Sequence, residues 1–378
     1  MDQRFIPAIL LLSLVFTGAP RLAVGTPSTT STADMASASA ERFDAAFADS
    51  LRKGLGGTPD EARPEVERLE ALVPEGDALR RRRFQATTCG VLHPRRRDAL
   101  KEAETLLAAE RAEASPDPTS LALLHLCRAA YQPSEQSDSA RKDYDEAVVQ
   151  ARRSGDDLLL GSMLSARSGV MSVRGEYARA LSDALEAQRL FERLGEHGPN
   201  GVVLQNAGIA YRRMGEYAQA EEYLRRSLDV PELSEDWVHR LISLLQLGYL
   251  YEETGRFSRA REVLRDALHL CTEKQSRNDC GYVRLALAGV EVNATSPERA
   301  MSLLDAAEAD FEASGDPGDP AMLALLRGQA LARLGRLEQA LGLLDTAIAI
   351  WTKEKNDRYL ALALPELTCR AIFGPVES

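Results

Sequence analysis

The 378-residue chain has 44% hydrophobic and 27% charged residues and a formal net charge of −11 at pH 7. This acidic charge disfavours binding to nucleic acid or to an anionic membrane surface, because both are negatively charged. Only 6% of the residues are aromatic, whereas alanine and leucine dominate, which favours closely packed helices and argues against a sheet-rich fold.

The first 25 residues have the pattern of a secretory signal peptide. Arg4 precedes an uncharged apolar stretch over residues 5–16, and the sequence Ala-Val-Gly at 23–25 fits a small-x-small cleavage site. The stretch is shorter than the ~20 residues of a membrane-spanning helix and Pro7 interrupts it, so cleavage is favoured over an uncleaved anchor. We therefore predict a periplasmic or otherwise exported chain. The alternative is a chain anchored by an uncleaved N-terminal segment.

A flexible linker and then a long repeat array are predicted after the signal peptide. Ser, Thr and Ala dominate residues 26–40, which is typical of a tether. Farther along, alanine recurs at a constant spacing of forty positions, and a second small residue stands seven positions after each. The two series are Ala140, Ala180, Ala220, Ala260, Ala300 and Ala340, and Ala147, Ala187, Ser227, Ala267, Ala307 and Ala347. A fixed period of this length is typical of a solenoid of stacked units.

Each unit of the array is predicted to form two short helices. In one unit Gly208 lets a neighbouring helix approach closely, Tyr211 fills the gap on the same face, and Gly215 ends the first helix. The second helix then begins, and the two helices cross at the alanine of the first series. The same three roles recur one and three periods later, at Gly248, Tyr251 and Gly255 and at Gly328, Leu331 and Gly335.

Two units depart from this pattern but keep the alanines in phase. The turn at Thr295–Pro297 lacks a glycine, and no helix-breaking glycine precedes Glu135. We interpret both as degenerate repeats. The solenoid is predicted over residues 41–357 with about seven repeats, clearest over 161–354, followed by an incomplete final repeat over 358–378.

The order of small residue, aromatic residue, helix break, alanine, bulky residue and alanine resembles the tetratricopeptide repeat (TPR). The resemblance implies an all-α fold, a right-handed TPR superhelix (α-solenoid) of antiparallel helix pairs. The period of forty positions exceeds the usual length of about 34, and the surplus falls after the second helix, as at residues 189–200. Longer second helices and turns are therefore expected.

A second resemblance covers roughly residues 60–364 and concerns the exported N-terminal region of bacterial membrane-bound diguanylate cyclases. In that family periplasmic repeats precede a transmembrane helix and a cytoplasmic cyclase domain with a GGDEF motif, and neither part is found in this sequence. The strings that carry the resemblance are Ala210-Tyr-Arg-Arg-Met-Gly-Glu-Tyr217, Met322-Leu-Ala-Leu-Leu-Arg-Gly328 and Asn356-Asp-Arg-Tyr-Leu-Ala-Leu-Ala-Leu364. The resemblance implies a signal-sensing module.

The cysteine spacing offers two candidate disulfides. Cys89 and Cys127 are separated by close to one period, and Cys280 follows nine positions after Cys271. In an exported protein either pair could join neighbouring units, and buried free thiols are the alternative. Cys369 would be left over.

No constellation of residues supports catalysis or metal binding. The His-x-Cys sequences at 125–127 and 269–271 lack the complement and spacing of a four-ligand zinc site, so we expect no metal and no cofactor. The sequence contains no His-Glu-x-x-His motif, no Gly-x-Ser-x-Gly motif and no phosphate-binding glycine loop. We therefore predict that the chain is not an enzyme.

The TPR resemblance implies a concave groove lined by the first helices, whose exposed face would bind a ligand. The candidate groove residues are Gln205, Asn206, Ile209, Arg212, Leu245, Gln246, Tyr249 and Glu252. Asn206 matches an asparagine of peptide-clamping repeats, but the basic partners of such a clamp are not evident. Side chains that merely cover the surface are the alternative interpretation.

Together these patterns predict a noncatalytic exported TPR scaffold that binds a protein or peptide, or a small ligand, in its groove and senses a signal. One alternative is the sensory portion of a diguanylate cyclase whose catalytic domain lies outside this chain. A weaker alternative is an envelope assembly factor or chaperone. We expect no nucleic-acid partner and no strong membrane contact after cleavage. An unpaired C-terminal helix would offer a surface for self-association, but the sequence does not decide whether the array dimerises. A repeat array specifies the shape of its groove more firmly than the identity of its ligand.

Overall fold

A computed structural model describes residues 32–54, 59–92, 99–132, 137–231 and 236–353 of the protein. Within these ranges the chain forms sixteen α-helices and no strand, which confirms the all-α prediction. No helix in the described ranges is both long and apolar enough to cross a bilayer. The predicted signal peptide (1–25) and incomplete final repeat (358–378) lie outside the described residues.

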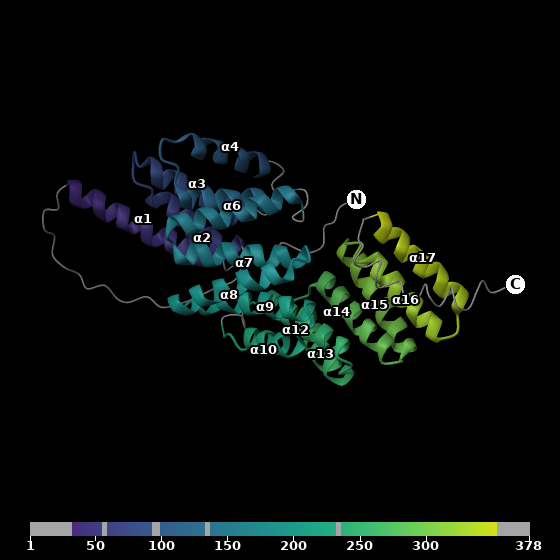
Figure 1. Cartoon of the computed structure of the whole chain (residues 1–378). Coiled ribbons are helices and arrows are strands. Elements are labelled where there is room, and N and C mark those ends of the chain that lie inside the picture. Colours follow the sequence, from purple (N-terminus) through teal and green to yellow (C-terminus); the bar gives the residue numbers. More distant parts are fainter. Residues whose placement is uncertain (1–31, 55–58, 93–98, 133–136, 232–235, 354–378) are drawn as a thin grey trace. The chain divides into compact units, whose positions relative to one another are not determined.

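The helices belong to two compact units, Met1–Ser243 and Leu244–Ser378 (Figure 1). The first unit contains α1 (Thr32–Gly54), α2 (Pro59–Leu72), α3 (Ala78–Leu92), α4 (Ala99–Ala112), α5 (Pro118–Ala130), α6 (Asp138–Ser154), α7 (Asp157–Val173), α8 (Tyr177–Leu194), α9 (His197–Arg213) and α10 (Tyr217–Leu228). The second contains α13 (Phe257–Glu273), α14 (Arg277–Asn293), α15 (Pro297–Ser314), α16 (Pro320–Arg333) and α17 (Leu337–Lys353). The division falls within α12 (Trp237–Glu253).

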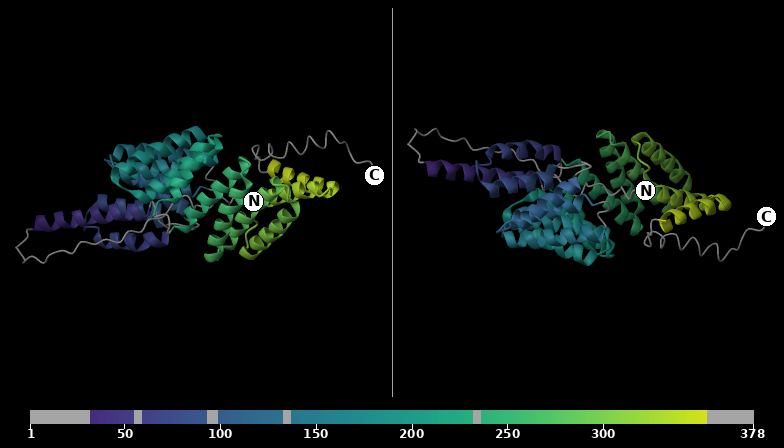
Figure 2. Two further views of the ribbon diagram at one scale, coloured as in Figure 1. Left: turned by 90° about the horizontal axis from the view of Figure 1, so that it is seen from below. Right: turned by 90° about the horizontal axis from the view of Figure 1, so that it is seen from above.

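Consecutive helices pack as antiparallel pairs, in agreement with the predicted repeat. In the first unit α5 packs against α6, α7 against α8 and α9 against α10. In the second unit α14 packs against α15 and α16 against α17, and these helices run side by side in all views (Figures 1 and 2). Within each unit a pair also contacts the next pair along the chain, so the core is a series of local interfaces.

The turns between helices share one backbone conformation and recur at a constant spacing of twenty positions. Glycine occupies the left-handed position with φ between 70° and 82° at Gly155, Gly175, Gly195, Gly215, Gly255, Gly315 and Gly335. At each of these turns except that of Gly155, the N–H of the residue after the glycine donates to a carbonyl five residues earlier, as from Glu216 to Tyr211 at 2.9 Å. This hydrogen bond satisfies a carbonyl that the helix end leaves without a partner.

Two turn positions in the second unit take the same conformation without glycine. Gln275 has φ 54° and Thr295 has φ 60°. Thr295 occupies the turn whose missing glycine marks a degenerate repeat, and the N–H of Ser296 still donates to Glu291 O at 2.8 Å. The hydrogen bonding of the turn is therefore retained, although a β-branched residue is strained in this conformation.

The two alanine series lie at the contacts between paired helices. Ala140, Ala180, Ala220, Ala260 and Ala300 are 0% exposed, and Ala340 is 2% exposed. The second series is equally buried, at no more than 1% exposure for its alanines. Because no room is left beside these methyl groups, alanine sets the distance between the helices.

Glycines on the first helices allow an even closer approach. A Cβ added at Gly208 would lie 2.7 Å from Leu224 Cγ, and one added at Gly248 would lie 2.5 Å from Leu264 Cδ2. Real Cβ atoms do not come so near to another carbon, so only glycine fits these positions without movement of the partner helix. The structure thus agrees with the close-approach role predicted for this position.

Helical structure begins earlier than the sequence pattern indicated. Residues 32–40 belong to α1, so the prediction of a flexible linker over residues 26–40 is wrong for this part. Alanine has the highest intrinsic helix propensity, and the segment runs directly into an amphipathic helix. That helix buries Phe43 and Phe47, whose ring centroids lie 6.0 Å apart.

Gly248→Ala should destabilise the chain, because the added methyl group overlaps Leu264. We expect the free energy of unfolding to fall by about 1–3 kcal/mol, measured by urea denaturation. Gly342→Ala is the matched control, since a Cβ at this helical glycine meets no atom within 4 Å. It should raise the free energy of unfolding by about 0.5–1 kcal/mol through helix propensity alone. Equal effects of the two substitutions would contradict this account.

Thr295→Gly should stabilise the chain by relieving left-handed strain at an exposed turn. We expect a gain of about 1 kcal/mol in the free energy of unfolding, after part of the relief is offset by the greater freedom of unfolded glycine. The reciprocal variant Gly255→Thr should lose a similar amount, since Gly255 has φ 70°. Urea denaturation of both variants measures the effect, and an unchanged midpoint for Thr295→Gly would argue against strain.

Candidate functional site

The predicted groove residues of α9 are not an accessible surface in this structure. Gln205 is 0% exposed and Asn206 is 1% exposed. The Gln205 amide donates from Nε2 to His239 O and to Ser243 Oγ, both at 2.7 Å, and so joins α9 to α12 within the first unit. Asn206 Nδ2 donates to Ser165 O at 3.2 Å and joins α9 to α7. Their assignment to a free binding face is therefore corrected: both amides bridge adjacent helices.

The other groove candidates of α9 are similarly enclosed. Arg212 is 3% exposed and Ile209 is half-buried. The prediction treated α9 as covered on one face only, but its residues from Gly201 to Gly208 are all buried. A side chain that is enclosed in this way has no surface to offer a ligand, so Arg212 is also corrected to a structural position.

The remaining candidates lie on α12 in the second unit. Leu245, Gln246, Tyr249 and Glu252 are all half-buried. Glu252 Oε1 accepts a hydrogen bond from Asn293 Nδ2 of α14 at 2.8 Å. The eight predicted residues are thus divided between the two units, and the structure does not gather them into one site.

Acidic and tyrosine side chains lie near Tyr282 in the second unit, and the sequence analysis did not identify them. Burial raises the pKa of the Tyr282 hydroxyl, and the negative charges of Asp316 and Asp319 raise it further, with smaller effects of Tyr249 and Asp279. Burial also raises the pKa of Asp279 and of Asp319. These groups come from α12, from α14 and from the segment between α15 and α16, so their proximity can be recognised only after the helices are packed.

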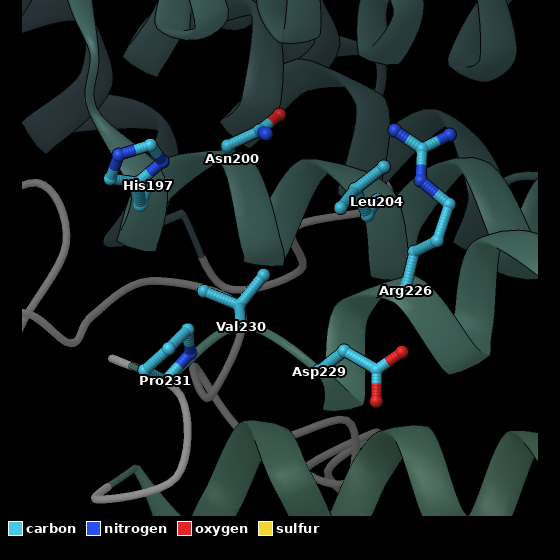
Figure 3. A pocket seen from close by; sticks show the side chains of 7 residues that line it. All are labelled: His197, Asn200, Leu204, Arg226, Asp229, Val230 and Pro231. Carbon is cyan, nitrogen blue, oxygen red and sulfur yellow. The ribbon is translucent and has the colours of Figure 1, made fainter.

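A hollow of about 380 Å³ opens in the first unit beside α10. Its lining residues are His197, Asn200, Leu204, Arg226, Asp229, Val230 and Pro231. Figure 3 shows the side chains of α9 on one side, Arg226 of α10 beside them, and the residues that follow α10 opposite. Polar side chains and the aliphatic Leu204, Val230 and Pro231 line the hollow together, which suits a short peptide stretch.

The hollow exists because α10 is short. This helix has 12 residues, whereas its counterpart α8 has 18. The helix ends at Leu228, three residues before Pro231, which has no N–H to donate to a continued helix. Asn200 Oδ1 is buried next to this hollow and has no hydrogen-bond partner among the described residues. The proline is the one sequence signal that could have located the hollow.

A buried network of charged groups lies between α4, α5 and α6. His125 Nδ1 donates to Asp143 Oδ1 at 2.8 Å, and Arg128 Nε donates to Asp143 Oδ2 at 2.8 Å. Arg111 Nη2 lies 3.1 Å from His125 Nε2. Because a guanidinium only donates, Nε2 accepts this bond and the imidazole proton resides on Nδ1. The nitrogen that would act as a general base is occupied, so the network is structural.

Asp143 remains ionised within this network. Burial raises the pKa of its carboxyl group, but hydrogen bonds from His125 and Arg128 outweigh burial and hold the pKa below its usual range. The arrangement recurs one period later, where Arg167 donates to Asp183 from Nε at 2.7 Å and from Nη2 at 2.8 Å. Paired arginine and aspartate thus belong to the repeat rather than to a single site.

The four candidate cysteines form two disulfides. Cys89 of α3 is joined to Cys127 of α5 with a Cα–Cα distance of 5.7 Å, and Cys271 of α13 to Cys280 of α14 with 5.5 Å. Each bond links one helix to a neighbouring helix of the same unit. Cys369 lies outside the described residues. Across the described part of the chain no group of three or more His, Cys, Asp or Glu side chains is arranged to hold a metal ion.

Comparison with known proteins identifies the repeat. Residues 159–233 and residues 243–277 each match the tetratricopeptide repeat family. The chain contains tetratricopeptide repeats. The human protein O-mannosyl-transferase TMTC1 is 35% identical over 89 residues, which are 24% of this chain and 9% of that protein. The match therefore spans a small part of that relative.

Solved TPR structures resemble the chain over most of its length. A Rap protein complexed with competence and sporulation factor has a TM-score of 0.59 at 11% identity, over 88% of this chain and 96% of that one. Aspartyl phosphate phosphatase F from Bacillus subtilis has 0.54 at 13% identity, over 91% and 95%. A signal-transduction ATPase with a TPR sensor from Pyrococcus horikoshii has 0.58 at 14% identity, over 80% and 46%. At these identities the likeness establishes the fold.

Asp143→Asn should lower the free energy of unfolding at neutral pH and should make this free energy depend less on pH in the acid range. The lowered pKa of Asp143 means that its stabilisation is present above about pH 4 and is lost as the pH falls through the folded-state value. Removing the charge should cost about 3–5 kcal/mol at pH 7 and less at pH 3, measured by urea denaturation. Asp138→Asn on the same helix is the control, because Asp138 is 83% exposed. Equal acid dependence of Asp143→Asn and the wild-type chain would contradict this role.

Proposed function

We propose that the protein is an exported, noncatalytic TPR scaffold that binds a peptide or a protein segment. The matches of both units to tetratricopeptide repeats carry this proposal, because such arrays supply binding surfaces rather than reactive centres. A Rap protein of the same fold has been solved with competence and sporulation factor, which supports ligand binding by an array of this kind.

The hollow beside α10 is the proposed contact surface in the first unit. Its imidazole, amide, guanidinium and carboxylate groups can exchange hydrogen bonds with a peptide backbone, while Leu204, Val230 and Pro231 accept an aliphatic side chain. The buried Asn200 Oδ1 offers an acceptor to an N–H group of the ligand, because no described residue occupies it. These features replace the amides of Gln205 and Asn206 as the proposed ligand contacts.

Export and signal sensing are further parts of the proposal. The signal-peptide pattern of the first 25 residues supports export. The two disulfides support it independently, because such bonds persist mainly in oxidising compartments. The resemblance to the exported repeats of diguanylate cyclases supports a sensory role and favours one alternative, a sensory portion that works with a separate or adjoining cyclase domain. The coding sequence that adjoins the gene distinguishes a stand-alone scaffold from such a portion.

A photocrosslinking amino acid placed at His197, on the exposed rim of the hollow, tests the binding surface in cells that export the protein. We expect a discrete adduct of one peptide or protein, identified by mass spectrometry. The same amino acid at Arg189, exposed on α8, should give no such adduct. Asn200→Trp should abolish the adduct by filling the hollow. The proposal fails for this surface if the adduct is absent or forms equally at both positions.

A further inference from the structure

A second hollow, of about 400 Å³, lies on a different part of the first unit and is lined by basic and aliphatic side chains. Its lining residues are Val148, Val149, Arg152, Arg153 and Arg167. The first four come from the C-terminal half of α6 and the last from α7. No acidic residue lines it, which sets it apart on a chain with a net charge of −11.

The three arginines differ in how firmly they are held. Arg167 is 13% exposed, and three of its N–H groups donate to Asp183 and Asp145. The two carboxylates neutralise the Arg167 guanidinium, so this residue shapes the wall of the hollow without adding net positive charge.

The other two arginines stand at the rim. Arg152 donates to Glu186 of α8 from Nη1 at 2.9 Å and from Nη2 at 3.1 Å, but it remains 55% exposed, so water screens the pair. Arg153 is exposed and forms no ion pair with a described residue. The Arg153 guanidinium can therefore hold a carboxylate through two parallel hydrogen bonds.

The hollow also has an apolar part, which favours a ligand that carries an aliphatic group as well as negative charge. Val149 is 42% exposed and is one of few large hydrophobic side chains that face solvent in the described residues. Val148 beside it is 3% exposed. Burying an aliphatic group against these valines removes apolar surface from water, which an inorganic anion cannot do.

We infer that this hollow docks an acidic peptide segment that carries an aliphatic side chain between its carboxylates. The inference rests on the proposed scaffold function and names the chemistry of one partner. The Arg153 guanidinium would receive one carboxylate, the exposed and water-screened Arg152 would attract the next, and the aliphatic side chain would cover Val149. The docking surface lies on α6 and α7, apart from the lining residues of the hollow beside α10.

Fluorescence anisotropy with a labelled Glu-Asp-Val-Glu-Glu peptide and the full chain tests the inference. We expect saturable binding that weakens as NaCl is raised, and no binding of the Lys-Lys-Val-Lys-Lys counterpart. Arg153→Glu should weaken binding at least about 10-fold, because it replaces an attractive charge by a repulsive one. Val149→Ser should weaken it several-fold. Both positions are exposed, and unchanged circular dichroism verifies that the variants are folded.

Arg189→Glu is the matched control, since it makes the same change in net charge at an exposed position of α8. Equal weakening by Arg189→Glu and Arg153→Glu would overturn the inference, because binding would then reflect net charge alone. Displacement of the peptide by inorganic phosphate together with no effect of Val149→Ser would also overturn it in favour of an anion site. The His197 adduct reports on the scaffold function separately: an intact adduct without binding of the acidic peptide refutes only this inference.

Discussion

The distance between paired helices is the constraint on which the rest of this structure depends. It is fixed where fully buried alanines meet the partner helix and where glycines on the first helices contact leucine. Each contact contributes little energy, but it recurs from one helix pair to the next. Because no bulky side chain stands between the helices, their backbones pack closely along most of their length. Stability therefore accumulates along the chain from local interfaces rather than from one central core.

Buried ion pairs between arginine and carboxylate side chains help to fix how one helix is aligned along its neighbour. The small side chains at the helix contacts already favour one alignment of the paired helices, and the ion pairs add to this preference. A slip would separate Arg128 from Asp143, or Arg167 from Asp183, and leave buried charges without partners. Because internal carboxylates occupy so many arginines, the net charge of the chain says little about the local charge of a given surface. Arg153 differs from these arginines, because it is exposed and forms no ion pair with a described residue.

The sequence predicted the parts of the fold that repeat. The period, the alanine positions and the close approach at Gly208 and Gly248 all follow from side-chain size, which a sequence displays directly. The groove residues could not be predicted in the same way. An amide such as Gln205 serves equally well to bind a ligand or to bridge two helices, and the choice depends on what covers the other side of α9. His125 illustrates the same limit, since its partner Asp143 belongs to another helix.

The common conformation of the turns has a consequence for how such a chain can change in length during evolution. Left-handed turn positions recur at a constant spacing, so any two of them present the same backbone geometry to the helices on either side. Unequal recombination between turns one full period apart would insert or remove one helix pair and join ends that already fit. No new loop would have to arise, and the neighbouring interfaces would meet the same alanines as before. The array can therefore gain or lose binding surface in whole pairs, while the residues that line each hollow diversify independently.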